Sequence, residues 1–193
     1  MPQFPPLYTI GHSNHPESHF VALLAQHGIQ TLVDVRSQPF SRYSPHFNRE
    51  SLSLNLPAAG IRYWFLGDQL GGRPVGDDYY DAAGHVLYSR VAEADFFRDG
   101  LAQVQQSLPA TRMALMCSEE NPLICHRHRL VARVLRDRGV PIQHIRQDGR
   151  LESYEQVEPP QQQRLLFDEL EEETWRSLRS VLPSPALGTS SND

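Results

Sequence analysis

Cys125 and the side chains that follow it are the residues best suited to catalysis. Cys125 precedes His126, Arg127 and Arg129 at the beginning of a helical pattern. Free N–H groups at a helix N-terminus and nearby cations stabilise a thiolate, so Cys125 is a candidate nucleophile. His126, or His12 from a distant part of the chain, could move protons. The alternative is that Cys125 is only a small residue at a helix start.

Cys117 offers a second thiol, and its chemistry depends on what lies nearby. It ends an apolar segment, where a buried free cysteine is more simply explained by packing. Glu119 follows it and could orient the catalytic base. Cys117, Cys125, His126 and His12 could also bind Zn²⁺ or Fe²⁺, although their spacing matches no common zinc finger. We therefore expect no cofactor and keep a metal site as the alternative.

Arginines near the ends of the apolar segments favour an anionic ligand. Asp34 and Arg36 lie two positions apart, so they face the same side of a strand. Arg36, Arg127 and Arg129 carry the rigid donor fork that fits carboxylate and phosphate groups. Ser13 adds a hydroxyl after another apolar segment. Asp34 could orient a base, or it could simply pair with Arg36.

Two loops add candidate substrate contacts. Residues 35–49 contain no acid but combine three arginines with aromatic residues, among them Phe40 and Tyr43. Such a composition suits stacking on bases and binding phosphates, which makes Tyr43 a candidate. The alternative is that the rings cover the edge of a sheet. In a later loop, Gly71 and Gly72 could let the backbone approach a ligand.

Five short apolar segments alternate with helical patterns. The expected strands cover 7–13, 31–36, 61–66, 113–117 and 141–146, and the expected helices cover Ser13 or Asn14 to Gly28, 50–59, 90–107 and 125–138. This alternation implies right-handed βαβ crossovers. The predicted fold class is α/β: one doubly wound, mostly parallel sheet of about five strands with helices on both faces. The candidate residues then converge at the carboxyl ends of the strands, where such sheets bind ligands.

Charge and composition divide the chain further. Residues 123–150 carry a net charge of +5, and residues 151–193 carry −6. We expect an α/β domain over 1–150, an acidic helical extension over 151–182 and a disordered tail over 183–193. The apolar residues of the extension that would pack on the domain are Leu166, Leu170, Trp175 and Leu178.

Composition also excludes several classes of protein. All 18 basic residues are arginine and the formal net charge is −5. Without lysine, Schiff-base catalysis, pyridoxal phosphate anchoring and a P-loop are excluded. The glycines do not form the GxGxxG motif of dinucleotide binding. Neither a signal peptide nor a membrane span is indicated, and two cysteines make no disulfide framework. We expect a cytoplasmic protein with no membrane partner.

Several segments together carry a resemblance to a known family. They are Tyr8–Ser13, Asp34–Arg36 with Pro39 and Ser41, Leu66–Gly72, Leu115–Glu119 through Pro122 to Cys125–Arg127, and His144–Ile145. Over about residues 7–147 the chain resembles the domain-of-unknown-function family 488, an uncharacterised group of bacterial and archaeal proteins. The resemblance implies an α/β fold and a shared site at these positions, and it implies no particular reaction.

The leading hypothesis is an enzyme. We expect a hydrolase or transferase that acts on a small anionic substrate, such as a nucleotide or a nucleic-acid fragment, through the Cys, His, Arg and Asp side chains named above. The alternatives are a module that binds nucleic acid or a nucleotide, and a metal-binding protein that uses Cys117, Cys125 and histidine.

Overall fold

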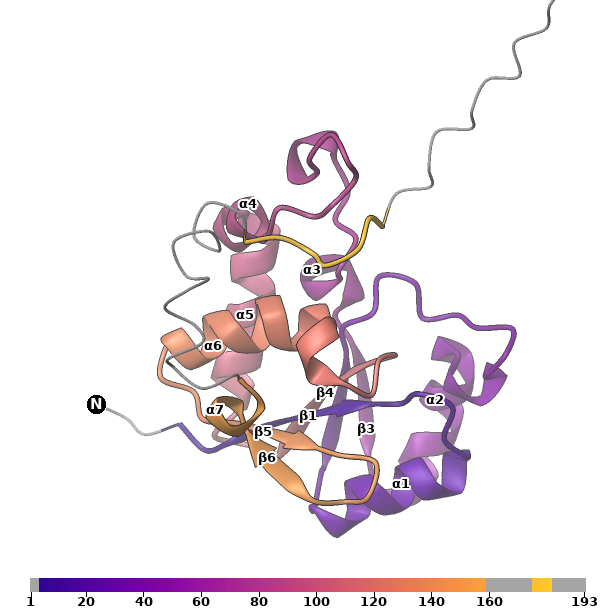
Figure 1. Ribbon diagram of the computed structural model, residues 1–193. Coiled ribbons are helices and arrows are strands. Elements are labelled where there is room, and N and C mark those ends of the chain that lie inside the picture. Colours follow the sequence, from indigo (N-terminus) through magenta and orange to yellow (C-terminus); the bar gives the residue numbers. More distant parts are fainter. Residues whose placement is uncertain (1–3, 159–174, 182–193) are drawn as a thin grey trace, which may run out of the picture.

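A six-stranded sheet forms the centre of the computed structural model, which describes residues 4–158 and 175–181 (Figure 1). In spatial order its strands are β3 (Arg62–Phe65), β2 (Thr31–Asp34), β4 (Met113–Cys117), β1 (Leu7–Gly11), β5 (Ile142–Ile145) and β6 (Leu151–Ser153). Neighbouring strands are parallel except for β6, which runs antiparallel to β5. The predicted α/β fold with a mostly parallel sheet is confirmed.

Helices cover both faces of this sheet (Figure 1). One face carries α1 (Glu17–Gln26), η1 (Pro45–Phe47), α2 (Arg49–Asn55) and η2 (Leu56–Ala59). The other carries α3 (Gly67–Leu70), α4 (Tyr88–Glu93), α5 (Asp95–Ser107), the π-helical η5 (Arg127–Ala132), α6 (Arg133–Asp137) and α7 (Tyr154–Val157). Two further 3₁₀ turns are η3 (Asp77–Tyr79) and η4 (Pro122–Ile124). Within the described residues, no helix is long and apolar enough to cross a membrane.

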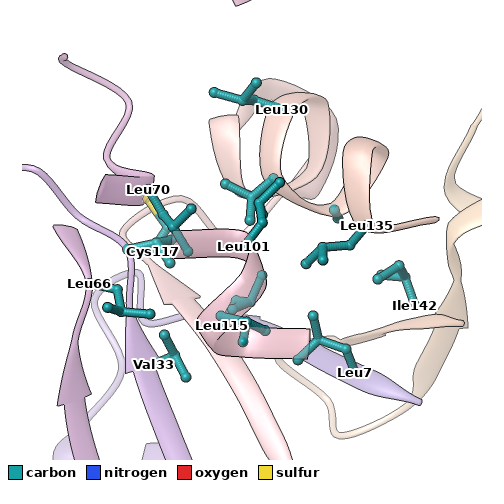
Figure 2. Packing of buried hydrophobic residues seen from close by; sticks show 14 of the residues in the cluster. Leu7, Val33, Leu66, Leu70, Leu101, Leu115, Cys117, Leu130, Leu135 and Ile142 are labelled. Atoms are coloured by element: carbon teal, nitrogen blue, oxygen red, sulfur yellow. The ribbon is translucent and has the colours of Figure 1, made fainter. Parts of the chain in front are cut away.

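Alternate residues of each strand pack into two separate apolar cores. Leu7 and Leu115 belong to the first core, where they face Leu101 of α5 (Figure 2). Their neighbours Tyr8 and Met116 belong to the second core, against α1 and α2. Because side chains on a strand alternate between its two faces, both faces can be apolar only if helices cover each one.

The connections that follow β1 and β4 leave the sheet on opposite faces. The helix after β1, α1, packs in the second core, whereas η5 and α6, which follow β4, pack in the first. Adjacent parallel strands with diverging connections leave a crevice beyond their carboxyl ends, where ligands bind in such sheets. β4 lies between β1 and β2. The fold therefore brings the ends of three strands to one crevice.

Two long helices expected from the sequence are interrupted. The helix expected at 90–107 is two helices, because the backbone at Ala94 is extended between α4 and α5 (φ −71°, ψ 140°). The helix expected at 125–138 begins later, since Cys125 is extended and a wide π-helical turn precedes α6. Cys125 thus stands just before the helix, and its carbonyl accepts the first two N–H groups, those of His128 and Arg129.

The first helix also begins later than its expected cap. α1 starts at Glu17 after Pro16, and neither Ser13 nor Asn14 caps it. Ser13 instead adopts the left-handed backbone conformation (φ 47°). Further along, the loop expected after the third strand contains the single-turn helix α3.

The C-terminal part of the described chain is not the expected acidic helix. β6 and α7 extend the domain beyond residue 150. Residues 159–174, with Leu166 and Leu170, and the expected tail 183–193 lie outside the described residues. Residues 175–181, which we call the strap, form no helix: Arg176 makes an isolated β-bridge with Leu87, and the chain bends at Leu178 and Arg179.

The strap lies beside residues 84–88 and is bonded to them. The Tyr88 N–H donates to the Trp175 carbonyl and the Ser177 N–H to the Val86 carbonyl, each at 2.9 Å. As expected, Trp175 packs on the domain, with its ring edge against Tyr88. Leu178 was expected to pack as well, but it is 53% exposed.

Candidate functional site

A cavity of about 390 Å³ opens at the carboxyl ends of the strands. The described lining comes from five parts of the chain: residues 36–38, 72–73, Tyr88, 117–126 in part, and the strap. The charged side chains of this lining are Arg36, Arg73, Arg179 and Glu119. With three cations and one carboxylate on its walls, the cavity suits an anionic ligand.

Two thiols and one imidazole meet on the cavity wall. The Sγ atoms of Cys117 and Cys125 lie 3.7 Å and 4.0 Å from Nδ1 of His126. The other ring nitrogen, Nε2, lies 2.9 Å from the Val35 carbonyl oxygen and must donate to it. In the neutral ring Nδ1 is therefore unprotonated, and its lone pair is directed at the two sulfurs.

The two thiols share one proton unequally. The hydrogen bond to Cys125, followed by burial, raises the pKa of the Cys117 thiol well above its usual range. Burial opposes ionisation of Cys125 as well. There, however, the hydrogen bond from Cys117 and then the charge of the neighbouring Arg127 outweigh burial and hold the pKa well below its usual range. The helix begins after Cys125, so this lowered pKa is caused by side chains and not by N–H groups of a helix N-terminus.

Glycine is required where the backbone passes His126. A Cβ on Gly72 would lie 2.8 Å from Cγ of His126, and one on Gly71 would lie 2.3 Å from the Gly67 carbonyl oxygen. Gly72 lines the cavity, whereas Gly71 is buried behind it. These glycines were expected to allow a close approach to a ligand, and the structure shows a close approach to the imidazole.

Asp34, Arg36 and His12 form a buried network behind the cavity. The Arg36 guanidinium donates from Nε and Nη2 to the Asp34 carboxylate at 2.9 Å and 2.6 Å, and from Nη2 to the Phe47 carbonyl. Its Nη1 donates to Nε2 of His12 at 3.0 Å. Tyr63 also donates to Asp34. Four of the five guanidinium N–H bonds are thereby used, and the Asp34 carboxylate offsets the charge of Arg36, so Arg73 and Arg179 are the better candidates for binding an anion.

His12 is held as a neutral acceptor. Its Nδ1 donates to the Ser13 carbonyl, so Nε2 is free to accept from Arg36. Burial first, and then the charge of Arg36, lower the pKa of His12 to about 4. His12 is absent from the described lining of the cavity and from the thiol–imidazole cluster. The expected metal set of four therefore reduces to Cys117, Cys125 and His126.

Arg127 anchors the loop after β4. Its guanidinium donates to the main-chain carbonyls of Glu119 and Glu120 and, through Nε, to the Thr9 hydroxyl at 3.2 Å. It is 1% exposed and does not belong to the described cavity lining. The expected anion contact is thus replaced by contacts to carbonyl oxygens, whose positions are fixed only by the folded loop.

A chain of hydrogen bonds continues from Arg127 through the interior. The Thr9 hydroxyl accepts from Arg127 and donates to Nδ1 of His144 at 2.7 Å. Nε2 of His144 then donates to Nδ1 of His128 at 3.0 Å, and Nε2 of His128 donates to Glu158 at 2.8 Å. With the Thr9 hydroxyl as donor to His144, each later bond runs in the same direction, and both rings are neutral.

Three other candidates lie away from the cavity lining. The Ser13 hydroxyl donates to Asn14, and the Arg129 carbonyl accepts from the Trp175 indole. Tyr43 is 95% exposed, and nearby Phe40 is 68% exposed. These two rings therefore do not cover the sheet edge. Phe47 of the same loop does, since it is fully buried and stacks on His12.

Several arginines of the basic segment 123–150 have local partners. They are Arg133 on Trp175, Arg136 with Asp137, Arg138 with Gln105, Arg146 with Glu120 and Glu152, and Arg150 with Asp148. Asp137 and Asp148 are already included in the net charge of +5, so of these acids only Glu120 and Glu152 offset it further.

Sequence reasoning missed two arginines of the cavity. Arg73 follows the glycine pair, and Arg179 comes from the strap. Arg73 could have been found, because it stands directly after Gly71 and Gly72. No local pattern could have identified Arg179, since its position depends on the return of the strap to residues 84–88.

Comparison with known families agrees with this architecture. The family model described as "Domain of unknown function DUF488" matches residues 17–142, and the chain belongs to this family. The match includes both cysteines and His126 but ends before the strap. No curated protein and no solved structure matches the chain.

Proposed function

We propose that the chain is an enzyme, a hydrolase or transferase, that acts on a small anionic substrate in the cavity. One observation carries this proposal: two thiols and an imidazole nitrogen lie together on the wall of a cavity that three arginines also line. A reactive centre beside fixed positive charges is what group transfer on a phosphate or carboxylate compound requires. We place this enzyme in the cytoplasm, where free thiols stay reduced.

The centre supports two kinds of chemistry. In the first, the Cys125 sulfur attacks the electrophilic atom of the substrate, the leaving group departs, and water or an acceptor then releases the covalent intermediate. In the second, the three side chains hold Zn²⁺ or Fe²⁺, which activates a water molecule. Both place the reaction at Cys117, Cys125 and His126.

The anion site can be tested before the substrate is known. Binding of inorganic phosphate is measured by calorimetry at low ionic strength for the full chain and for Arg73→Gln and Arg179→Gln. Each substitution should raise Kd about tenfold, because each removes a charge-assisted contact. Arg62→Gln, at the amino end of β3, is the matched control and should leave Kd unchanged. Unchanged Kd in both cavity variants would remove the anion site from the proposal.

The reactive centre needs a separate test. A panel of phosphate esters, carboxylic esters and nucleotides is screened for turnover. Cys125→Ser should lose at least about a hundredfold in kcat on any substrate found, since it changes the group at the reacting centre. A substrate on which Cys125→Ser retains full turnover would show that the reaction takes place elsewhere.

A second candidate function is binding of single-stranded nucleic acid, and the exposed rings favour it. Phe40 and Tyr43 flank Arg42 on the loop that leads from the cavity residues 36–38. Aromatic rings and arginine suit stacked bases and phosphates. Binding of a short RNA at low salt that weakens in Tyr43→Ala would support this function, and a flat isotherm would dispose of it.

A further inference from the structure

We infer that Cys117, Cys125 and His126 bind one divalent metal ion of the Zn²⁺ class, with a fourth coordination position open to the cavity. The site stands on its own geometry. Only its catalytic role rests on the proposed function.

The spacing of the three ligand atoms fits tetrahedral coordination. Bonds of about 2.3 Å to sulfur and about 2.0–2.1 Å to nitrogen place a sulfur and a nitrogen about 3.6 Å apart on a tetrahedral ion. The two sulfur–nitrogen distances here are 3.7 Å and 4.0 Å, and all three ligand atoms lie within 4.8 Å of one another. The two sulfur–nitrogen distances thus lie within a few tenths of an ångström of the tetrahedral value.

His126 is oriented as a metal ligand. Metal-bound histidines commonly donate their second ring N–H to a carbonyl or carboxylate, which fixes the tautomer and the ring plane. Here Nε2 donates to the Val35 carbonyl, so the free lone pair of Nδ1 points at the sulfurs. Gly72 packs directly on the ring and leaves no room for a Cβ, which limits its rotation. The imidazole is thus positioned before any ion arrives.

The donor set and its burial select the class of ion. Two thiolates and one imidazole suit Zn²⁺ or Fe²⁺ and are poor ligands for Mg²⁺ or Ca²⁺. Cys125 and Cys117 are only 2% and 7% exposed, and buried charge is costly unless compensated. A divalent cation neutralises the charge of two thiolates. The positive charge of the cavity arginines then remains available to bind an anionic substrate.

The fourth position faces the cavity because all three ligands line it. A water bound there would be acidified by the ion. Glu119, the carboxylate of the described lining, would accept one proton of this water as its oxygen bonds to the electrophilic carbon or phosphorus of the substrate. Glu119 would return that proton to the leaving group as its bond breaks, so that one water is consumed per bond cleaved.

The inference is tested first by metal content. The full chain, without an affinity tag, is produced with added zinc and iron and purified without chelator, and its metals are measured by mass spectrometry. We expect about one equivalent per chain, since such sites bind stoichiometrically. Cys117→Ser, Cys125→Ser and His126→Ala should each lose most of it, while His19→Gln, at an exposed histidine, should retain it. Less than about a tenth of an equivalent in the folded wild-type chain would overturn the inference.

A second measurement covers variants that fold poorly. Co²⁺ is titrated into the metal-free chain, and circular dichroism checks each variant for folding. Thiolate-to-cobalt charge transfer and the intense visible bands of a tetrahedral ion should appear at one equivalent in wild type, and Cys125→Ser should weaken them. Cobalt bands of an octahedral, sulfur-free ion would overturn the site.

The two proposals fail separately. Phosphate binding that depends on Arg73 and Arg179, without bound metal, would refute the metal site alone. Stoichiometric metal without any phosphate binding or turnover would leave the metal site and refute the proposed enzyme.

Discussion

His144 shows how the interior keeps a titratable ring uncharged. Its two nitrogens are bonded to Thr9 and His128, and the ring is completely buried. Burial, followed by the charges of His128, Arg127 and Arg146, lowers the pKa of His144 to about 2. Protonation of Nδ1 would bring a second proton against the Thr9 hydroxyl and would bury a charge near Arg127 and Arg146, so the native state resists it.

Lowering the pH should therefore begin to destabilise the fold at a higher pH than the one at which carboxylates become protonated. An unfolded histidine takes up its proton near pH 6.5 while folded His144 stays neutral, so stability is full above that pH and falls below it. The loss is about 1.4 kcal/mol per pH unit, or roughly 2 kcal/mol by pH 5. Urea unfolding at several pH values measures this slope. His144→Asn should make it shallower by about one proton, and His19→Gln should not. An unchanged slope in His144→Asn would show that other groups carry the effect.

Residue types at strand ends were enough to identify part of the site. Cys125, His126 and Arg36 were predicted because reactive and cationic groups follow apolar segments, and all three line the cavity. Arg127 was predicted by the same logic and proved to bind main-chain carbonyls. A sequence shows which side chains carry charge, but the carbonyl oxygens that compete for that charge take their positions only in the folded loop.

Among the elements, the strap is the one that sequence patterns described least well. Its indole donates to the Arg129 carbonyl at 2.9 Å, and the Arg133 guanidinium lies 4.6 Å from the Trp175 ring. Arg176 pairs with Asp81 at the other side. These contacts are distant in sequence, so the amphipathic pattern predicted a helix that the described strap, residues 175–181, does not form.

Trp175→Ala should release the strap and leave the sheet intact. The lost hydrogen bond and cation–π contact together correspond to about 1–2 kcal/mol. We expect the Ser177 and Tyr88 amides, which bond across this contact, to exchange hydrogen at least about tenfold faster by mass spectrometry. Leu178→Ala, at an exposed neighbour, should leave their exchange unchanged. Protected amides in Trp175→Ala would show that backbone pairing alone fixes the strap.

The strands were the most predictable elements, and the interruptions were the least. Each expected strand is present because a short apolar run has one stable place in this fold, between two helical layers. The extended residue at Ala94 has no sequence signal, since alanine favours a helix. β6 was missed because its residues are half exposed and its pairing with β5 depends on the turn between them.

In the whole molecule, two apolar cores hold the sheet in place, and the charged side chains of the cavity lie at the carboxyl ends of its strands. A ligand that binds only the folded chain must therefore stabilise all of it. Phosphate at about a hundred times its Kd should add about 2.7 kcal/mol and raise Tm by roughly 5–10 °C. The double variant Arg73→Gln/Arg179→Gln should lose most of this rise in a thermal scan. An equal rise in the double variant would place phosphate outside the cavity.

The strap lies beyond residues 17–142, which define the family, yet it supplies part of the cavity wall. The thiol–imidazole cluster and this part of the cavity wall thus lie in different segments of the chain, which can diverge independently in evolution. Under the proposed function, members of the family with a different C-terminal sequence would keep the thiol–imidazole cluster and admit different molecules to the cavity.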